Sequence, residues 1–184
     1  MWGSYEEKFA QARLLQFYFM LHPGKKLSFM GTELAHFREW DESRAMDWCL
    51  LEYPMHQAFL RLVRDLNRLY LQEPALFSGE YHSGRFQWIT REAVDDGVFA
   101  FTRTSAEGET FLIVLNTQDK THNHYPLYFC NFCHAHLVLC TDSPYYGGSQ
   151  SSVGETRSIP GGVMGKSHTL YLDLPALSGS LYRL

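Results

Sequence analysis

The residues best suited to chemistry lie in the stretch 32–51, which is rich in charge and tryptophan. Two of its carboxylates, Glu33 and Glu39, are candidates for an acid–nucleophile pair. Group transfer with retention uses two carboxyl groups about 5–5.5 Å apart. The same stretch also carries the carboxylates Asp41, Glu42 and Asp47, together with Arg38, Trp40 and Trp48. The pattern is typical of a functional loop rather than of a regular element.

A second set of residues combines thiols and imidazoles. The run Cys130 to His134 matches the C-x-x-C-H pattern of covalent haem attachment. That use requires an export route, and the N-terminus lacks the basic start and apolar core of a signal peptide. Together, Cys130, Cys133, His134, His136 and Cys140 have the types and approximate spacing of zinc ligands. On a strand, however, Cys130 and Cys133 would face opposite sides. We therefore predict free thiols, no bound metal and no cofactor.

The composition describes a globular chain, since 45% of the 184 residues are hydrophobic and 15% are aromatic. The net charge of −4 gives no electrostatic basis for binding nucleic acid or an anionic membrane. No apolar run approaches the ~20 residues of a membrane span. Four cysteines are too few to cross-link a chain of this size, which predicts a reducing, cytoplasmic location.

Two helices and a short strand must position the charged stretch. Ser4 and Glu7 form a capping-box pattern that starts the first helix, and His22-Pro23-Gly24 ends it. Its buried face is expected to carry Tyr5, Phe9, Ala12, Leu15 and Phe19. Residues 27–30 predict a short strand that stops at Gly31. The second helix is expected from Tyr53-Pro54 to Glu73-Pro74, with a buried stripe of Met55, Phe59, Leu62, Leu66 and Leu69.

Beyond residue 83 the hydrophobic period changes to two. Strands are predicted at 86–89, 98–103, 110–115, 136–139, 169–172 and 180–183. Turn residues separate them, and short antiparallel strands at this interval indicate a β-sandwich. The predicted organisation is α+β, with a helical part at residues 1–80 and an all-β sandwich domain at residues 81–184.

Several motifs stand at the spacing of a known family. In the first half they are His22-Pro23-Gly24-Lys25-Lys26, Phe29-Met30-Gly31, Glu33, Arg38-Glu39-Trp40 and Asp47-Trp48. In the second half they are Leu115-Asn116, His124-Tyr125, Thr141-Asp142, Tyr146-Gly147-Gly148-Ser149 and Leu174-Pro175-Ala176-Leu177. With them the whole chain resembles the C-terminal part of the 1,4-α-glucan (glycogen) branching enzymes of the α-amylase clan. The resemblance implies that residues 1–80 are the remnant of the end of a (β/α)₈ barrel.

Branching enzymes cleave an α-1,4-glucan, hold the severed piece covalently and pass it to a 6-hydroxyl. The family's catalytic carboxylates come from earlier barrel strands, so the resemblance implies no catalytic residue in this chain and a chain inactive by itself. It implies positions beside the substrate for Glu33, Arg38, Glu39, Trp40 and Trp48. The tryptophans would either stack on glucose rings or pin the loop. The expected partner is α-glucan, and the barrel remnant is expected to self-associate, mainly through residues 5–31.

Two other functions are compatible with the sequence. The chain could be a stand-alone carbohydrate-binding or interaction module built on the sandwich, or a zinc-binding protein centred on Cys130 to Cys140. The branching-enzyme interpretation is favoured because the motif at 22–52 belongs to a catalytic barrel, and a free binding module would not need it.

Overall fold

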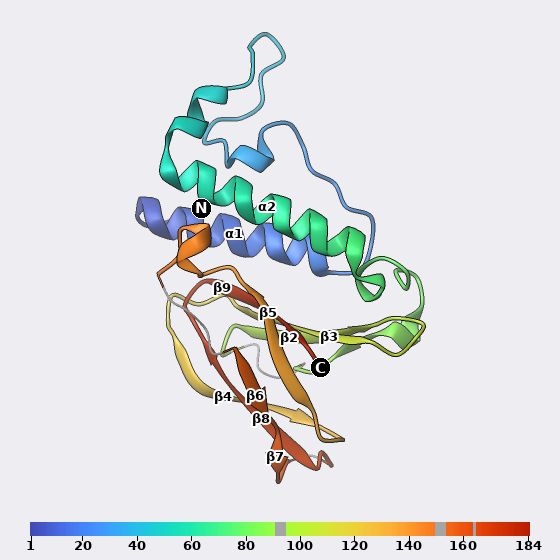
Figure 1. Cartoon of the computed structure of the whole chain (residues 1–184). Coiled ribbons are helices and arrows are strands. Elements are labelled where there is room, and N and C mark those ends of the chain that lie inside the picture. Colours follow the sequence, from blue (N-terminus) through green and yellow to red (C-terminus); the bar gives the residue numbers. More distant parts are fainter. Residues whose placement is uncertain (91–94, 150–153, 164) are drawn as a thin grey trace.

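Two helices cover one face of a β-sandwich in the computed structural model, which describes residues 1–90, 95–149, 154–163 and 165–184 (Figure 1). Helix α1 spans Tyr5–Leu21 and helix α2 spans Pro54–Gln72. The predicted capping box is confirmed, because the Glu7 N–H donates to Ser4 Oγ at 3.2 Å and the Ser4 N–H donates to the Glu7 carboxylate at 2.6 Å. The predicted ends of both helices are confirmed as well.

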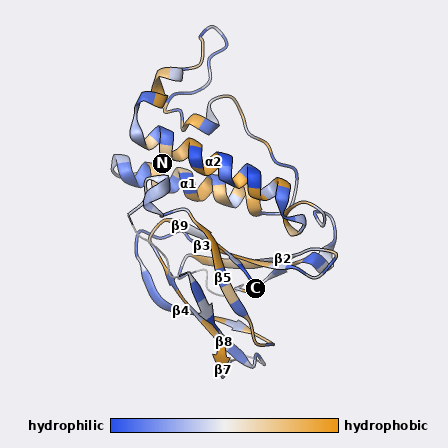
Figure 2. Ribbon diagram, viewed as in Figure 1, coloured by the Kyte–Doolittle hydropathy of each residue, from blue (hydrophilic) through white to orange (hydrophobic). Residues whose placement is uncertain are grey.

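The buried face of α1 differs from the predicted stripe. Leu15 is 59% exposed, whereas Phe17 and Leu21 are fully buried. The helix lies between α2 and the sheet, and the ribbon of each helix alternates between hydrophobic and hydrophilic residues (Figure 2). A helix covered on two sides buries more than a single stripe, which a one-face pattern cannot describe. On α2 the prediction was better, since Phe59, Leu62 and Leu66 are buried.

The strand predicted at residues 27–30 is wrong. No strand is described between α1 and α2, and Leu27, Phe29 and Met30 are 75%, 56% and 60% exposed. A strand exists only when its backbone pairs with a neighbour, and none of the described strands lies beside this segment.

The predicted antiparallel strands form two sheets. The larger sheet has the order β1 (Phe86–Trp88), β2 (Val98–Thr104), β3 (Thr110–Asn116), β9 (Ser178–Arg183), β5 (His134–Cys140) and β6 (Glu155–Arg157). The smaller sheet has the order β4 (His122–Phe129), β8 (His168–Leu174) and β7 (Ile159–Pro160). Sequence reasoning missed β4, β6 and β7. Strand β4 carries a register shift between His122 and Tyr125, which breaks the alternation that marks a strand.

One hydrophobic core joins the helices to the larger sheet, and a second lies between the two sheets. The first contains Phe17 of α1, Leu66 of α2 and Ile113 of β3. The second contains Val114 of β3 and Leu170 of β8. Helices and sheet therefore stabilise each other. Neither helix, within the part of the chain that the structure describes, is long and apolar enough to cross a membrane.

Two buried ion pairs lie where α1 packs on the larger sheet, a contact called the helix–sheet junction below. Arg13 of α1 is 3.3 Å from the Asp142 carboxylate and also donates to the Gly147 carbonyl at 3.1 Å. Arg103 of β2 is 3.3 Å from Glu80 and donates to the Leu21 carbonyl at the end of α1 at 3.2 Å. Breaking such a pair leaves an uncompensated buried charge, so each pair fixes α1 against the sheet.

Candidate functional site

The charged stretch forms a loop that projects beyond the two helices, on the side away from the sheets (Figure 1). Its base turns at Gly31, whose φ of +83° lies in the left-handed region that favours glycine. A 3₁₀ turn, Thr32–Leu34, follows and buries Leu34. The Leu34 carbonyl lies 2.6 Å from Nδ1 of His56, a buried residue of α2. This contact fixes the start of the loop to the second helix.

A carboxylate clamp closes the middle of the loop. Arg38 donates from Nε and Nη2 to the two oxygens of Asp47, each at 2.6 Å. His36 Nε2 lies 2.9 Å from the same carboxylate. The hydrogen bonds from Arg38 lower the pKa of Asp47 and raise that of Arg38. Bidentate hydrogen bonds of this kind require a specific geometry, so the clamp fixes the path of the chain between Arg38 and Asp47.

A hollow of about 230 Å³ opens beside the clamp. Its lining residues include Arg38, Glu39 and Trp40. The Trp40 ring is half exposed and meets the edge of the Phe29 ring at a centroid distance of 5.5 Å. The hollow thus combines an aromatic face with carboxylate and guanidinium groups. This combination suits a hydroxylated ring, which has apolar C–H faces and hydrogen-bonding edges.

The structure brings together three of the five predicted substrate-adjacent residues. Arg38, Glu39 and Trp40 share the hollow, whereas Glu33 and Trp48 are not among its lining residues. Glu33 lies half-buried on the first 3₁₀ turn. Trp48 starts a second turn, Trp48–Glu52, and is 61% exposed. Glu33 and Glu39 therefore do not line one hollow as an acid–nucleophile pair would.

Sequence reasoning missed His36 and assigned no role to Asp47. Both belong to the clamp, and the hollow is also lined by Asp41, Glu42 and Arg44. The only sequence signal was the density of charge around Arg38, because the spacing of residues in an irregular loop does not determine which of them meet.

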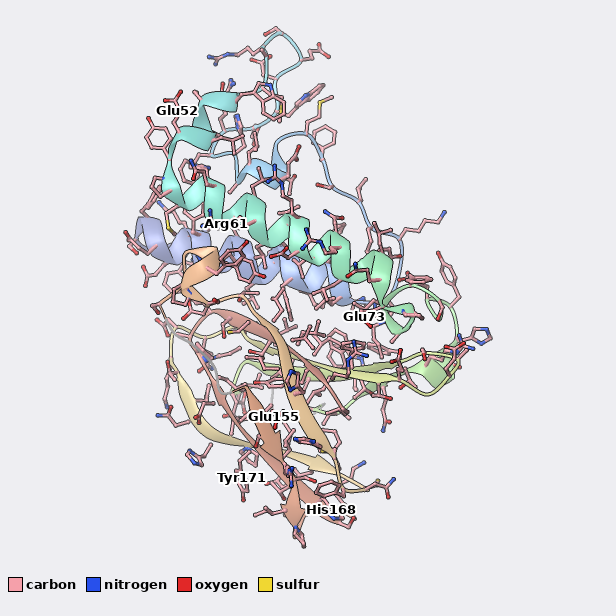
Figure 3. The ribbon with its side chains drawn as sticks, in the orientation of Figure 1. Glu52, Arg61, Glu73, Glu155, His168 and Tyr171 are labelled. Carbon is pink, nitrogen blue, oxygen red and sulfur yellow. The ribbon has the colours of Figure 1, made fainter. Side chains whose placement is uncertain are left out.

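The cysteines and histidines of the second half do not gather at one point. Cys130 is exposed, Cys133 is half-buried and Cys140 is in the core. His134 and His136 instead lie 3.6 and 3.1 Å from the Glu155 carboxylate of β6. Glu155 is labelled on the sandwich in Figure 3. Among the described residues, no group of three or more His, Cys, Asp or Glu is placed to hold a metal ion. The geometry gives the zinc alternative no support, and the free thiols stay a prediction.

The sequence matches a known family and longer curated proteins. Residues 88–184 match the model of the α-amylase C-terminal all-β domain. The 1,4-α-glucan branching enzyme GlgB of Oceanobacillus iheyensis is 35% identical, over 99% of this chain and 29% of that protein. The GlgB protein of Methylobacillus flagellatus is 37% identical, over 96% of this chain and 25% of that protein. The chain thus spans well under a third of the length of these relatives.

Solved structures with a similar fold include a debranching enzyme and a Thermus thermophilus protein. A Nostoc punctiforme debranching enzyme superposes with a TM-score of 0.65 at 18% identity, over 95% of this chain and 31% of that one. Ttha1563 from Thermus thermophilus gives a TM-score of 0.60 at 22% identity, over 98% of this chain and 31% of that one. At these identities the comparison establishes the shared fold.

Proposed function

Because this chain belongs to the family of α-amylase C-terminal all-β domains, we propose that it acts as the C-terminal part of a 1,4-α-glucan branching enzyme. The resemblance indicated by the sequence motifs is confirmed by relatives of that name, which are 35% to 38% identical. One observation carries the proposal. The similarity extends over 99% of the chain, so it includes the loop that precedes residue 88 as well as the sandwich.

In this function the loop supplies one wall of a glucan-binding cleft. The Arg38–Asp47 clamp holds the loop in shape before a glucan arrives, which reduces the entropy lost on binding. Trp40 presents its exposed ring to the C–H face of a glucose unit, and Phe29 supports that ring from the side. Glu39 accepts hydrogen bonds from sugar hydroxyls. The loop thus positions substrate and takes no part in bond cleavage.

Residues 1–80 would form the end of the catalytic barrel, and residues 81–184 the sandwich domain. The exposed apolar segment 27–30 supports this division, because Leu27, Phe29 and Met30 are side chains that a barrel strand would bury. Neighbouring strands from the rest of the enzyme would pair with this segment. In their absence the same surface favours self-association through residues 5–31, which stays a prediction, as does the cytoplasmic location.

The 184-residue chain by itself should neither branch nor hydrolyse amylose. A retaining reaction needs two carboxyl groups about 5–5.5 Å apart on either side of the glycosidic bond, and we assign that pair to the rest of the enzyme. Iodine staining of amylose incubated with the chain should stay constant. A fall in staining that disappears in both Glu33→Gln and Glu39→Gln would contradict the assignment.

Binding of glucan to the loop can be tested by electrophoresis through gels that contain amylopectin. The wild-type chain should be retarded, and Trp40→Ala should reduce the retardation because it removes the stacking ring. Tyr81→Ala is the matched control, since Tyr81 is 80% exposed and lies outside the loop. Equal retardation of Trp40→Ala and the wild type would argue against the cleft role.

A further inference from the structure

A second groove, separate from the loop hollow, lies between α1 and the larger sheet. Its cavity volume is about 460 Å³. The floor is apolar and buried, formed by Leu14, Leu115 and Leu177. Four aromatic side chains also line it: Trp2 before α1, Tyr18 on α1, Trp88 on β1 and Phe99 on β2. Trp2 is 53% exposed and Tyr18 37%, so aromatic surface is available to a ligand.

Neighbouring residues fix the backbone of Trp2 and the ring of Trp88. The Trp2 N–H donates to Gln11 Oε1 at 3.3 Å, and Gln11 Nε2 donates back to the Trp2 carbonyl at 2.7 Å. The Trp88 ring packs against Phe86 and Phe101, with centroid distances of 5.4 and 5.3 Å. Rings fixed before binding lose little conformational freedom when a ligand stacks on them. The Trp88 ring is therefore held in place before a ligand arrives, and the backbone that carries Trp2 is fixed by Gln11.

The absence of charged residues among the described lining of the groove favours a neutral ligand. None of the described residues that line it is charged, in a chain where 20% of all residues are. A phosphorylated, acidic or basic ligand would find no counter-charge there. The polar lining consists of the Gln11 amide and the Thr117 hydroxyl. An uncharged aromatic groove with a few neutral hydrogen-bonding groups suits a neutral ring with apolar faces and hydroxyl edges.

We propose that this groove binds a short stretch of α-glucan, independently of the loop hollow. The choice of α-glucan as the ligand rests on the proposed function, whereas the position of the site rests on the lining of the groove. Because most of the contact is stacking, binding at this site is weak, with a dissociation constant on the order of millimolar. Its role would be to retain a glucan chain at the surface of the enzyme.

The experiment is a titration of the 184-residue chain with maltoheptaose, followed through the indole N–H signals of its four tryptophans in ¹H–¹⁵N NMR spectra. The signals of Trp2 and Trp88 should shift along a saturating curve. Trp2→Ala should weaken the binding reported by Trp88 about three- to tenfold. Leu15→Glu, a change at an exposed α1 position, should abolish it by placing a charge in the groove. Trp40→Ala is the matched control and should leave the Trp88 curve unchanged.

The outcomes separate this proposal from the proposed function. If Trp40 shifts and neither Trp2 nor Trp88 does, the groove proposal fails while the cleft assignment stands. If Trp2 and Trp88 shift and Trp40 does not, the groove proposal stands and the cleft assignment fails. If the Trp2 and Trp88 signals follow protein concentration rather than maltoheptaose, the groove is a contact between two copies of the chain, and the proposal is overturned.

Discussion

The helix–sheet junction and the projecting loop both contain arginine–carboxylate pairs, but the two pairs differ in their surroundings. At the junction, the side chains of Arg13 and Asp142 are 3% and 9% exposed. In the loop, those of Arg38 and Asp47 are 31% and 33% exposed, although their contacts are shorter. Burial rather than distance decides how much a pair matters to folding, because water screens the exposed charges.

The comparison also separates stability from function. The junction residues hold two parts of the sequence in one core, so a change there should act on the whole fold. The loop residues contact few other elements and present their side chains to solvent, so a change there should act on ligand binding. Three substitutions and one change of pH test this distinction, and their effects on folding range from a large loss of stability to none.

Removing the junction carboxylate should cause the largest loss. Asp142→Ala leaves Arg13 buried without its counter-charge and also removes the acceptor for the Ser149 hydroxyl at 3.0 Å. We expect the free energy of unfolding to fall by about 3–5 kcal/mol, measured by urea denaturation. Asp119→Ala, at an exposed position, should leave it nearly unchanged. A loss below ~1 kcal/mol in Asp142→Ala would contradict the role assigned to the pair.

Adding one methyl group to the junction should have the next largest effect. A Cβ on Gly179 of β9 would lie 2.3 Å from the Phe17 ring of α1. Gly179→Ala should therefore lower the free energy of unfolding by about 1–3 kcal/mol through overpacking. The double variant Gly179→Ala with Phe17→Leu should lose less than the sum of the two single changes. Strict additivity would indicate that the two residues are not in contact.

Breaking the loop clamp should leave global stability unaltered. In Asp47→Asn the bidentate contact with Arg38 is lost. Both side chains are about a third exposed, so water screens their charges and we expect the same midpoint of unfolding as in the wild type. Hydrogen exchange of the amides in residues 36–48 should become faster, and the shift of the Trp40 indole signal on adding maltoheptaose should shrink. A large drop in the midpoint would show that the loop belongs to the folding core.

Acid should affect the clamp only at low pH. Hydrogen bonds from Arg38 hold the pKa of Asp47 below its ordinary value. The stabilisation that the Asp47 carboxylate gives to the clamp is therefore complete above the pKa of an unfolded aspartate, about 3.9. This stabilisation is lost as pH falls through the lower pKa of Asp47 in the folded chain. Amide exchange in residues 36–48, corrected for the intrinsic rate, should be constant from about pH 5 to 8; opening within that range would contradict the assignment.

The limits of most elements could be read from the sequence alone. The Ser4–Glu7 capping box and Pro54 mark the starts of the helices, and period-two runs mark six of the strands. The family motifs identified the relatives, and their density around Arg38 drew attention to the loop. These signals depend on residues a few positions apart in the sequence, so they can be read without knowing the tertiary structure.

Burial and contact were decided by the tertiary structure. α1 buries Phe17 against Gly179, a residue 162 positions later, and exposes Leu15 where the pattern predicted burial. Residues 27–30 remain outside any described sheet because no partner strand lies beside them. The clamp that joins His36 and Arg38 to Asp47, and the aromatic groove between α1 and β1, depend on how distant segments pack. The sequence shows which residues are apolar or charged. Which residues they contact is decided by the fold, because a contact also depends on residues that are distant in the sequence.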